Sequence, residues 1–448
     1  MRSTLSAFNE VWQCQFKQRL IQQLNQFQPH AKIVLGCSGG MDSMLLLHLL
    51  AELIPERLSV ISIDHQLQRV SAAWSQFVHQ CCEQYSISCV VVKVDVQAGN
   101  VEAQARAARY QAFSQYLQPW DVLVLAHHQQ DQAETVMLRL LQGSGVRGLA
   151  AMCEVENRSY YTLWRPLLSL SKQHIQLWVQ QLNICYVDDP MNHDMAYDRV
   201  WCRDTLWAVL QQRFPKMQDS IARCAMLMQD ADDILQDVLQ QDFIFCMDAQ
   251  QRIELDKLAQ LSNARQRQVL SAWMQAAQPY RPPLAMVQRL QQEVIAARED
   301  AQSILHYADY YFVRFANQLY RYSEQDWLNF QTIPQMQQIR FRLGQHAQTA
   351  LGQVLIQRTQ DMGLDAALLA QPLSLFPRQG GEKIQFYARA GHRVLKKELQ
   401  TAKIAPWMRH QIQILMYHNV VLGVFTPQGF WLAASPYCQA QGWLPYLQ

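Results

Sequence analysis

The segment SGGMDS, residues 38–43, lies between an apolar strand-like run and a leucine-rich helical run. Glycines let an anion approach the backbone closely, and the first N–H groups of a helix attract negative charge. With hydroxyl donors from Ser38 and Ser43, this glycine loop is expected to form a phosphate nest, and the helix to begin near Ser43. The carboxylate of Asp42 would repel a phosphate unless a cation bridged the two, which implies Mg²⁺.

Two other interpretations of the glycines are weaker. The loop has no Gly-x-x-x-x-Gly-Lys pattern and is therefore not a Walker A loop. It could also be a simple glycine turn with a capping serine. A second glycine-rich stretch, GSGVRG (143–148), follows a helical run instead of a strand, so a dinucleotide fingerprint is not expected there. Gly143 is better explained as a helix C-cap.

A second group of polar residues follows the strand-like run DVLVLA (121–126). His127, Asp131 and Glu134 are spaced i, i+4 and i+7, which predicts one shared helical face. Two carboxylates and an imidazole at that position could hold Mg²⁺ or accept a proton. The alternative is an exposed helix face without a catalytic role.

Two further stretches carry arginines next to acids. In NVEAQARAARY (100–110), Asn100 is a candidate N-cap, and Arg106 and Arg109 share a face with Glu102. Such arginines could clamp phosphates, or they could form a surface ladder of ion pairs. The second stretch, residues 188–203, combines Asp188, Asp189, Pro190 and Asn192 with the two arginines Arg199 and Arg203. A capped loop and helix is the alternative there.

The elements that must position these residues alternate between strand and helix. Strand-like runs at 32–36, 57–65, 88–96 and 121–128 are separated by helical patterns, which predicts a doubly wound parallel α/β sheet. Ligands of such sheets bind beyond the carboxyl ends of the strands.

Beyond the sheet, residues 216–330 have mainly helical periodicity, with a hairpin expected at 307–322. Residues 331–448 alternate strands and turns, with a hairpin turn at 426–429. We therefore predict a catalytic domain (1–215), a mainly helical domain (216–334) and a small α+β domain (335–448).

Charge is unevenly distributed along the 448 residues. The net charge is only +2, but residues 340–410 hold eleven Lys/Arg and four Asp/Glu, or +7, which leaves −5 for the rest. A basic C-terminal module indicates a polyanionic partner, although a solvated basic surface would look the same. The eleven cysteines include no Cys-x-x-Cys pair, and no apolar run reaches about 18 residues, which together favour a cytoplasmic protein without membrane spans.

The glycine loop resembles the signature of the PP-loop ATP pyrophosphatases, which cleave ATP between its α and β phosphates and adenylate a substrate oxygen. The whole ordered set resembles one family, the bacterial tRNA(Ile)-lysidine synthetases. The N-terminal pieces that carry this resemblance are SGGMDS, IDHQL, NVEAQARAARY, AHHQQDQAETVMLRLLQGSGVRGL, WRPLL and DDPMNHDMAYDRVWCR. The C-terminal pieces are FPRQGGEKIQ, GHRVLKKELQ, KIAPWMR and VLGVF.

Four positions depart from the pattern of that family. Gln66 and Gln68 stand where the family usually has glycine and arginine after Asp-His. Gln379 occupies the position where the family usually has the second of two paired arginines. Val200 occupies a position where the family usually has an asparagine. These departures concern individual phosphate or RNA contacts and leave the overall pattern intact.

The resemblance implies a two-step ligation that uses ATP, Mg²⁺ and free L-lysine. The C2 oxygen of the wobble cytidine in the CAU-anticodon isoleucine tRNA is adenylated, and the lysine ε-amine then displaces AMP to form lysidine. The implied catalytic residues are Asp42, His127, Asp131, Glu134 and Arg109, with Asp42 and Asp131 as metal ligands. Those implied for the nucleotide are Ser38, Gly39, Gly40, Met41, Asp42, Ser43, Asp64 and Arg106. Those implied for tRNA are Arg199, Arg203, Arg378, Lys383, Arg393, Lys396 and Lys397.

Three other functions remain open at this point. A tRNA 2-thiolation enzyme of the PP-loop class usually needs cysteine pairs, which the chain lacks. A small-molecule ligase would leave the basic module unexplained, and a non-catalytic tRNA-binding protein would be expected to lose residues of the glycine loop. The basic module could alternatively serve stability or a homodimer.

Overall fold

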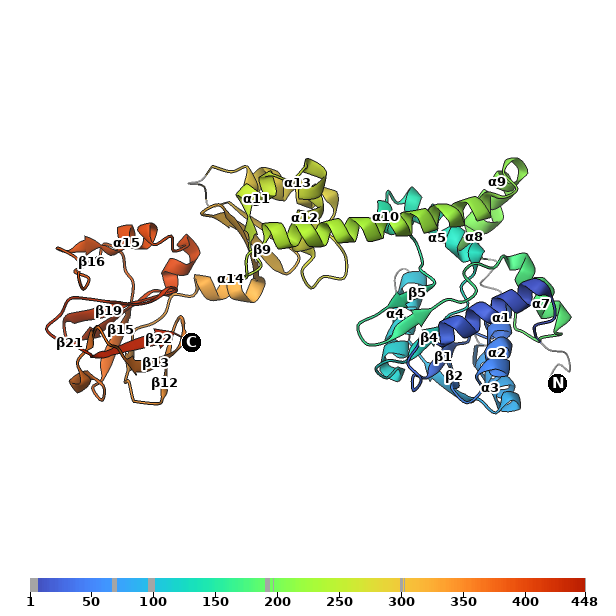
Figure 1. Ribbon diagram of the computed structural model, residues 1–448, viewed down its shortest axis with the longest axis horizontal. Coiled ribbons are helices and arrows are strands. Elements are labelled where there is room, and N and C mark those ends of the chain that lie inside the picture. The colour runs from blue at the N-terminus through green and yellow to red at the C-terminus, as the bar shows by residue number, and fades with distance from the viewer. Residues whose placement is uncertain are drawn as a thin grey trace. The chain divides into compact units, whose positions relative to one another are not determined.

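The computed structural model describes residues 7–66, 71–95, 101–189, 194–195, 197–298, 301 and 303–447, without the side chains of 101–103. The expectations for Gln68, Asn100, Glu102, Pro190 and Asn192 therefore lie outside the described residues or side chains. The chain forms two compact units, Met1–Asp237 and Val238–Gln448 (Figure 1). Among the described residues, every helix is too short or too polar to cross a lipid bilayer.

The N-terminal unit is built on one six-stranded sheet in the order β3-β2-β1-β4-β6-β5. All neighbours pair in parallel except β5 and β6, so the predicted parallel sheet carries one antiparallel edge strand. The four predicted strands are all present. The strands are β1 (Ile33–Gly36), β2 (Leu58–Asp64), β3 (Ser88–Lys93), β4 (Val122–Val124), β5 (Val155–Asn157) and β6 (Thr162–Trp164).

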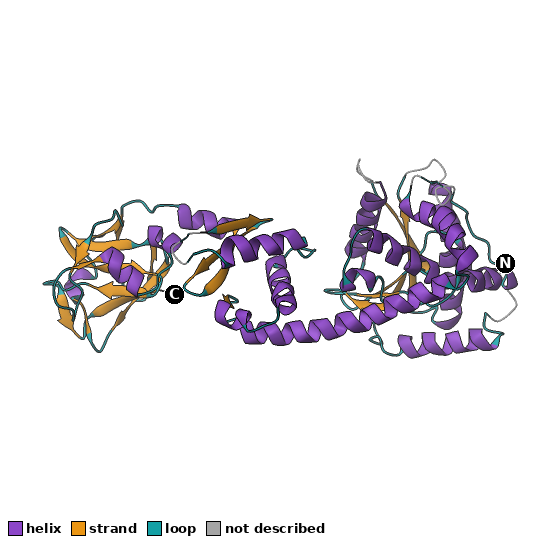
Figure 2. Ribbon diagram, turned by 90° about the horizontal axis from the view of Figure 1, so that it is seen from above, coloured by secondary structure: helices purple, strands orange, loops and turns teal. Residues whose placement is uncertain are grey.

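Helices cover both faces of this sheet, as Figure 2 shows. In β1, Ile33 and Leu35 pack into a core with α1, α2, α3 and α7, whereas Val34 packs into a second core with α4. Burial on both faces explains why the strands are continuous apolar runs. The helices are α1 (Val11–Leu24), α2 (Met41–Leu53), α3 (Ser71–Tyr85), α4 (Val101–Tyr116), α5 (Gln129–Leu141), α6 (Val146–Leu149), α7 (Lys172–Gln181), α8 (Asp198–Trp201), the π-helical turn η2 (Cys202–Leu206) and α9 (Trp207–Arg213).

The 30-residue helix α10 (Met217–Cys246) leads into the second unit. The first part of the second unit is mainly helical and contains one four-stranded sheet in the order β7-β10-β9-β8. The predicted hairpin is present as β9 (Tyr310–Phe315) and β10 (Gln318–Ser323). The other elements are β7 (Ile253–Glu254), α11 (Leu255–Ala259), α12 (Asn263–Gln275), α13 (Leu284–Arg289), the π-helical turn η3 (Leu290–Ile295), β8 (Ile304–Tyr307) and α14 (Glu324–Gln331).

The last part of the second unit is richer in β-structure than the sequence suggested. Two five-stranded sheets, β11-β15-β18-β19-β20 and β12-β13-β22-β14-β21, contribute to one shared core. The predicted turn at 426–429 joins β19 to β20. The strands are β11 (Gln337–Ile339), β12 (His346–Thr349), β13 (Gly352–Arg358), β14 (Met362–Leu364), β15 (Leu373–Pro377), β16 (Lys383–Ile384), β17 (Arg393–Val394), β18 (Gln413–Tyr417), β19 (Val420–Thr426), β20 (Gly429–Leu432), β21 (Cys438–Ala440) and β22 (Trp443–Leu447). The helices are η4 (Ala366–Leu368), α15 (Leu395–Thr401) and η5 (Pro406–Gln411).

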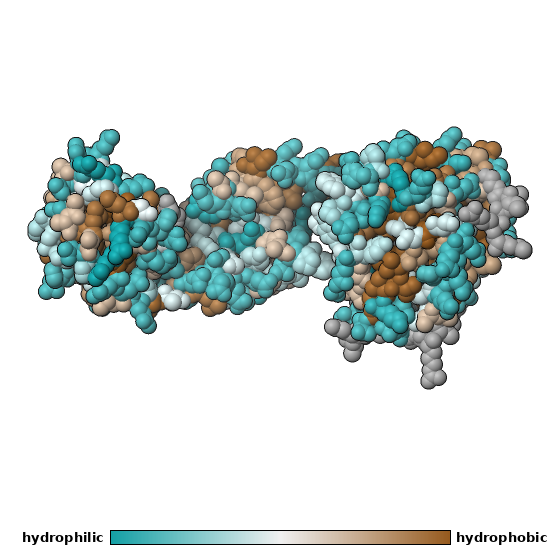
Figure 3. All heavy atoms as spheres, turned by 90° about the horizontal axis from the view of Figure 1, so that it is seen from below, coloured by the Kyte–Doolittle hydropathy of each residue, from teal (hydrophilic) through white to brown (hydrophobic). Residues whose placement is uncertain are grey.

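Both units expose separate apolar patches within a mainly hydrophilic surface on the face seen in Figure 3.

Within the second unit, Trp407 of η5 packs with Trp327 of α14 in a buried cluster, and Tyr322 of β10 lies against both rings. This aromatic cluster holds the helical part and the β-rich part of that unit together.

Gln66 adopts a left-handed backbone conformation, with a φ of 53°. Its backbone N–H donates to Asp64 Oδ1 at 2.9 Å, which fixes this turn at the end of β2. Glycine, the residue that the family resemblance leads one to expect here, adopts this φ without a steric penalty. The departure at Gln66 therefore keeps the turn and adds backbone strain.

We expect Gln66→Gly to raise the free energy of unfolding of the N-terminal unit by about 1 kcal/mol, because it removes the left-handed strain. Denaturant titration of the full chain checks this, and Gln66→Ala serves as the control that should bring no gain. A lower stability for Gln66→Gly would show that the glutamine side chain contributes more than the turn costs.

Candidate active site

A cavity of about 660 Å³ opens at the carboxyl ends of β1 and β4. These two strands are neighbours in the sheet, and the chain leaves them in opposite directions across it, toward β2 and toward β6. The cavity therefore lies at the switch point of the sheet, and it lies beyond the carboxyl ends of the strands, where the sequence places a ligand site. The cavity is lined by residues of the glycine loop, of 125–131, of 186–188 and of 199–204, with contributions from β2, α4 and α7.

The glycine loop leads directly into α2, with one correction to its expected details. Gly39 has a φ of 84°, and a Cβ there would lie 3.2 Å from Val78, so this position requires glycine. Gly40 has an ordinary φ of −69° and is the N-cap of α2, which begins at Met41 instead of near Ser43. The Ser43 hydroxyl donates to the Gly40 carbonyl at 2.9 Å and lies 3.4 Å from Ser38 Oγ.

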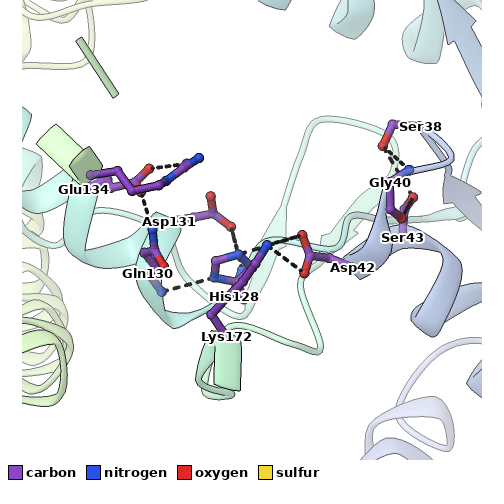
Figure 4. A network of polar contacts seen from close by, with 10 residues as sticks. Ser38, Gly40, Asp42, Ser43, His128, Gln130, Asp131, Glu134 and Lys172 are labelled. Atoms are coloured by element: carbon purple, nitrogen blue, oxygen red, sulfur yellow. Dashed lines mark hydrogen bonds and ion pairs between the residues drawn. The ribbon is translucent and has the colours of Figure 1, made fainter. Parts of the chain in front are cut away.

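Four charged or polar side chains meet at the floor of the cavity (Figure 4). The Lys172 ammonium lies 3.2 Å from Asp42 Oδ2, and His128 Nε2 lies 3.8 Å from the same oxygen. His128 Nε2 also lies 3.5 Å from Asp131 Oδ2. Two carboxylates from different helices thus face one imidazole nitrogen, and a protein cation already balances one of them.

The hydrogen bonds around His128 determine which of its nitrogens carries the proton. The Gln130 backbone N–H donates to His128 Nδ1 at 3.2 Å, so the neutral ring carries its proton on Nε2. The His128 backbone N–H donates in turn to Asp131 Oδ2 at 2.8 Å, which closes a capping box at the start of α5. His128 is buried and therefore orients both carboxylates toward the cavity.

The carboxyl group of Asp131 is tuned toward its ionised form. Burial by itself would raise its pKa, but His128, His127 and the His128 backbone N–H outweigh burial and lower it. An ionised carboxylate beside the glycine loop can bind a cation or orient an amine.

His127 lines the cavity, but its properties do not suit a proton acceptor. Burial lowers the pKa of His127 to about 3, against the attraction of Asp131. Its Nδ1 atom is buried without a hydrogen-bond partner. A neutral imidazole of such low basicity can contact a bound ligand, but it takes up a proton poorly.

We expect His127 to make the fold sensitive to mild acid. Below about pH 6.5 the unfolded chain protonates this imidazole, whereas the native state does not until about pH 3. Stability should therefore fall with decreasing pH across that window, by about 1.4 kcal/mol per pH unit from this group. Denaturant titrations at pH 7 and pH 5 measure the free energy of unfolding of the wild type and of His127→Asn. The wild type should lose more stability between the two pH values than the variant does, and an equal loss in both proteins would contradict this expectation.

Glu134 differs from its expected place beside Asp131. Its side chain is fully buried and does not line the cavity. It accepts from Arg203 Nε at 3.0 Å and Nη2 at 3.3 Å, and from Gln130 Nε2 at 3.0 Å. The expected face shared by His127, Asp131 and Glu134 is therefore not formed, because His127 precedes the helix and Glu134 turns inward to hold Arg203 at the cavity wall.

The arginines of the expected sites divide into those that line the cavity and those that do not. Arg109, Arg199 and Arg203 line it. Arg106 is exposed, with its guanidinium 5.1 Å from the centre of the Tyr110 ring, and it lies outside the lining. Asp64 is also outside the lining, since it is buried and accepts from the Gln66 backbone, whereas its neighbour His65 reaches the cavity.

Sequence reasoning missed Lys172, and one local signal could have found it. Lys172 is the first residue of α7 after the N-cap Ser171. A cation is unfavourable at a helix N-terminus, where the dipole is positive, so a lysine there needs a compensating partner. That partner is Asp42, 130 positions away in sequence, which no helical or strand periodicity could reveal.

The implied metal can be tested against the residues present. Carboxylate oxygens are the ligands that Mg²⁺ prefers, and Asp42 and Asp131 face the same point. Within the described parts of the chain, no cluster of three His, Cys, Asp or Glu side chains could hold a metal by itself. The residues therefore fit a Mg²⁺ ion that takes further ligands from phosphate and water.

The C-terminal basic residues form a surface that we call the basic face, made of Lys383, Arg393, Lys396 and Lys397. All four are exposed and come from the β16–β17 pair and from α15, which directly follows β17. Arg378 lies apart from them, half-buried and 3.6 Å from Glu382. Gln379 is exposed beside it, and its backbone N–H donates to Glu382 at 2.5 Å.

Three protein-family descriptions match the chain in order. Residues 12–210 match the PP-loop domain, residues 254–320 the TilS substrate binding domain and residues 373–443 the TilS substrate C-terminal domain. Among solved structures, the chain is similar to the U34-tRNA thiolase NcsA from Methanococcus maripaludis, with a TM-score of 0.39, 18% identity and coverage of 48% of this chain and 78% of that one.

Curated relatives match over nearly the full length. The tRNA(Ile)-lysidine synthase of Acinetobacter baylyi is 53% identical over 448 residues, which covers 100% of this chain and 97% of that protein. The enzyme of the same name from Chromobacterium violaceum is 35% identical, over 85% of this chain and 87% of that protein. Because the identity extends over the complete chain and all three domain matches occur in order, the chain belongs to the tRNA(Ile)-lysidine synthase family.

Proposed function

We propose that this protein ligates free L-lysine to C2 of the wobble cytidine in the CAU-anticodon isoleucine tRNA. ATP first adenylates the C2 oxygen and releases pyrophosphate. The lysine ε-amine then forms a C–N bond at C2, the C2–O bond breaks, and AMP leaves. The full-length identity to enzymes named tRNA(Ile)-lysidine synthase supports this reaction, which we assign to the cytoplasm.

The first step uses the glycine loop and the charges opposite it. The N–H groups at the start of α2 and the hydroxyls of Ser38 and Ser43 would hold the phosphates. A Mg²⁺ ion bound by Asp42 and Asp131 would neutralise charge that develops on pyrophosphate. Lys172 would supply a second positive charge, because its ammonium already lies beside Asp42.

The second step requires a deprotonated amine, since the ordinary pKa of a lysine ammonium is about 10.4. Asp42 and Asp131 both line the cavity, and Asp42 is already paired with Lys172. Because the pKa of Asp131 is lowered, we assign Asp131 the orientation of the incoming ammonium, which releases its proton to water. Glu134 acts as a positioning residue through Arg203, because it lies behind the guanidinium. His127 is assigned a contact with bound substrate and no proton transfer.

The tRNA would be held by two surfaces. Arg199 and Arg203 line the cavity and would contact the anticodon region. The basic face lies on the second unit and would contact phosphates elsewhere on the RNA, which positions the molecule without reading its sequence. Arg378 is less exposed than Arg393, which stays accessible although it pairs with Glu398 at 3.3 Å, so we assign Arg378 a smaller share of the binding.

The single observation that carries the proposal is the intact glycine loop facing Asp42, Lys172, His128 and Asp131 within one cavity. Incubation with ATP, radiolabelled lysine and individual tRNA transcripts, followed by nucleoside analysis, tests it. Lysine-dependent label in the wobble nucleoside of the CAU isoleucine tRNA alone is the expected result. ATP cleavage without transfer of lysine to any tRNA would overturn it.

A further inference from the structure

A second cavity, of about 470 Å³, lies within the C-terminal unit, between β10 of its helical part and the segments around α15 and β19 of its β-rich part. Its lining holds two tyrosines, three glutamines and three basic residues, and no acidic residue. Neither the proposed reaction nor the basic face uses any of these residues. A cationic, amide-rich and aromatic lining matches the chemistry of a nucleotide.

One wall of this cavity presents a guanidinium that lies over an aromatic ring. The Arg252 guanidinium lies over the Tyr320 ring, 5.3 Å from its centre. Asp248 holds Arg252 there through a hydrogen bond of 2.6 Å to its Nε atom. The Arg252 side chain remains 32% exposed, so part of it is open to a ligand. A fixed guanidinium plane is a surface on which a nucleobase stacks.

The β-rich part supplies an exposed positive charge to the cavity lining. Lys403 follows α15 in a left-handed backbone conformation, with a φ of 52°, that a hydrogen bond from the Ile404 N–H to the Leu399 carbonyl stabilises. Its side chain is exposed, and no acidic side chain forms an ion pair with it among the described residues. Arg252 and Arg321 are already engaged by Asp248 and the Trp273 carbonyl, so Lys403 is the cation suited to an incoming phosphate.

We propose that this cavity binds one nucleotide, with its base stacked on the Arg252–Tyr320 pair and its phosphate at Lys403. This inference rests on the proposed function in one respect, because an unstacked nucleotide of the bound tRNA is the source that the enzyme would always meet. A free mononucleotide such as AMP, the product of the reaction, has the same chemistry and is the second possible source.

Two substitutions separate the two halves of the site in the full-length protein. Lys403→Gln removes one phosphate contact, so tRNA affinity should fall and the slope of log affinity against log salt should decrease by about 0.7–0.9. Arg252→Lys keeps the charge and removes the plane, so affinity should fall by about tenfold or less with an unchanged salt slope. The control is Lys257→Gln, an exposed lysine outside the cavity that pairs with Glu254 at 3.0 Å.

The source of the nucleotide is decided by a parallel titration with AMP while a non-hydrolysable ATP analogue fills the first cavity. A tRNA nucleotide predicts the two effects above without AMP binding. A free mononucleotide predicts a second AMP site that Lys403→Gln and Arg252→Lys both weaken. Unchanged tRNA binding and AMP binding in both variants, relative to Lys257→Gln, would overturn the proposal.

The proposed function is assessed separately in the same experiment. At saturating tRNA, the wild type and Lys257→Gln should form lysidine at the same rate, since Lys257 belongs neither to the N-terminal unit nor to this cavity. If the wild-type protein formed no lysidine, the proposed function would be refuted. The effects of the variants on nucleotide binding could still be interpreted independently.

Discussion

Asp42→Asn is expected to lower tRNA-dependent pyrophosphate release by a factor on the order of 100 or more, while the protein stays folded. Asparagine has nearly the same shape but no charge, so it loses both its attraction for Lys172 and its capacity to bind a cation beside the glycine loop. The fold should survive because the Asp42 side chain is 25% exposed at the first turn of α2. The loss of its favourable interaction with the helix dipole costs only about 0.3–1 kcal/mol.

The measurement is pyrophosphate release at several Mg²⁺ concentrations, with circular dichroism as the check on folding. Asp256→Asn, an exposed aspartate in the first turn of α11, is the matched control and should keep wild-type activity. Lys172→Gln should reduce release less than Asp42→Asn does, because raised Mg²⁺ can replace part of its charge. Near wild-type release by Asp42→Asn at limiting Mg²⁺ would show that this carboxylate has no role in the first step.

Replacement of all four residues of the basic face by glutamine should weaken tRNA binding by two orders of magnitude or more near physiological salt. Each lost phosphate contact lowers the slope of log affinity against log salt by about one unit, so the total change should approach four. ATP binding should be unchanged, because the glycine loop lies in the other unit. Fluorescence titration of labelled tRNA at three or more salt concentrations measures both quantities.

The design of this experiment follows from the aromatic cluster. Deletion of residues 335–448 would remove Trp407 from its contacts with Trp327 and Tyr322 and expose those rings. Charge substitutions avoid that damage. The pair Lys396→Ala with Lys397→Ala should show part of the loss, and the matched pair Arg340→Ala with Arg342→Ala, both exposed, should show less. Equal losses for the two pairs would mean that binding depends on overall charge and not on the basic face.

The fold of the N-terminal unit could be predicted from sequence because its strands are buried on both faces. Continuous apolar runs such as 33–35 between helical patterns leave few other arrangements. The order of the strands was less accessible, since it depends on which runs pair in space. The β-rich part of the second unit was underestimated because several of its strands have only two or three residues, too short to show an alternating pattern.

Residues of the candidate site could be predicted where a short sequence motif contains them. They could not be predicted where their place depends on contacts that are distant in sequence. The glycine loop and Asp131 line the cavity, as expected from their positions after the ends of two parallel strands. Glu134 and Asp64 lie outside the cavity lining, because a polar residue in such a stretch can point inward to support a neighbour. Lys172 was missed because its partner lies on another helix.

The cavity of the N-terminal unit draws on residues from Gly36 to Asp204, which has a consequence for the order of events during protein synthesis. The glycine loop is made early, but β4 and Lys172 leave the ribosome only later. At about 5–20 residues per second, tens of seconds can separate the first and last contributions to the site. A nascent chain that ends before Lys172 can pair β1 with β2 and β4 yet leaves Asp42 without its cation. A nascent chain should therefore gain the complete cavity only when roughly the first 200 residues have been made and folded together.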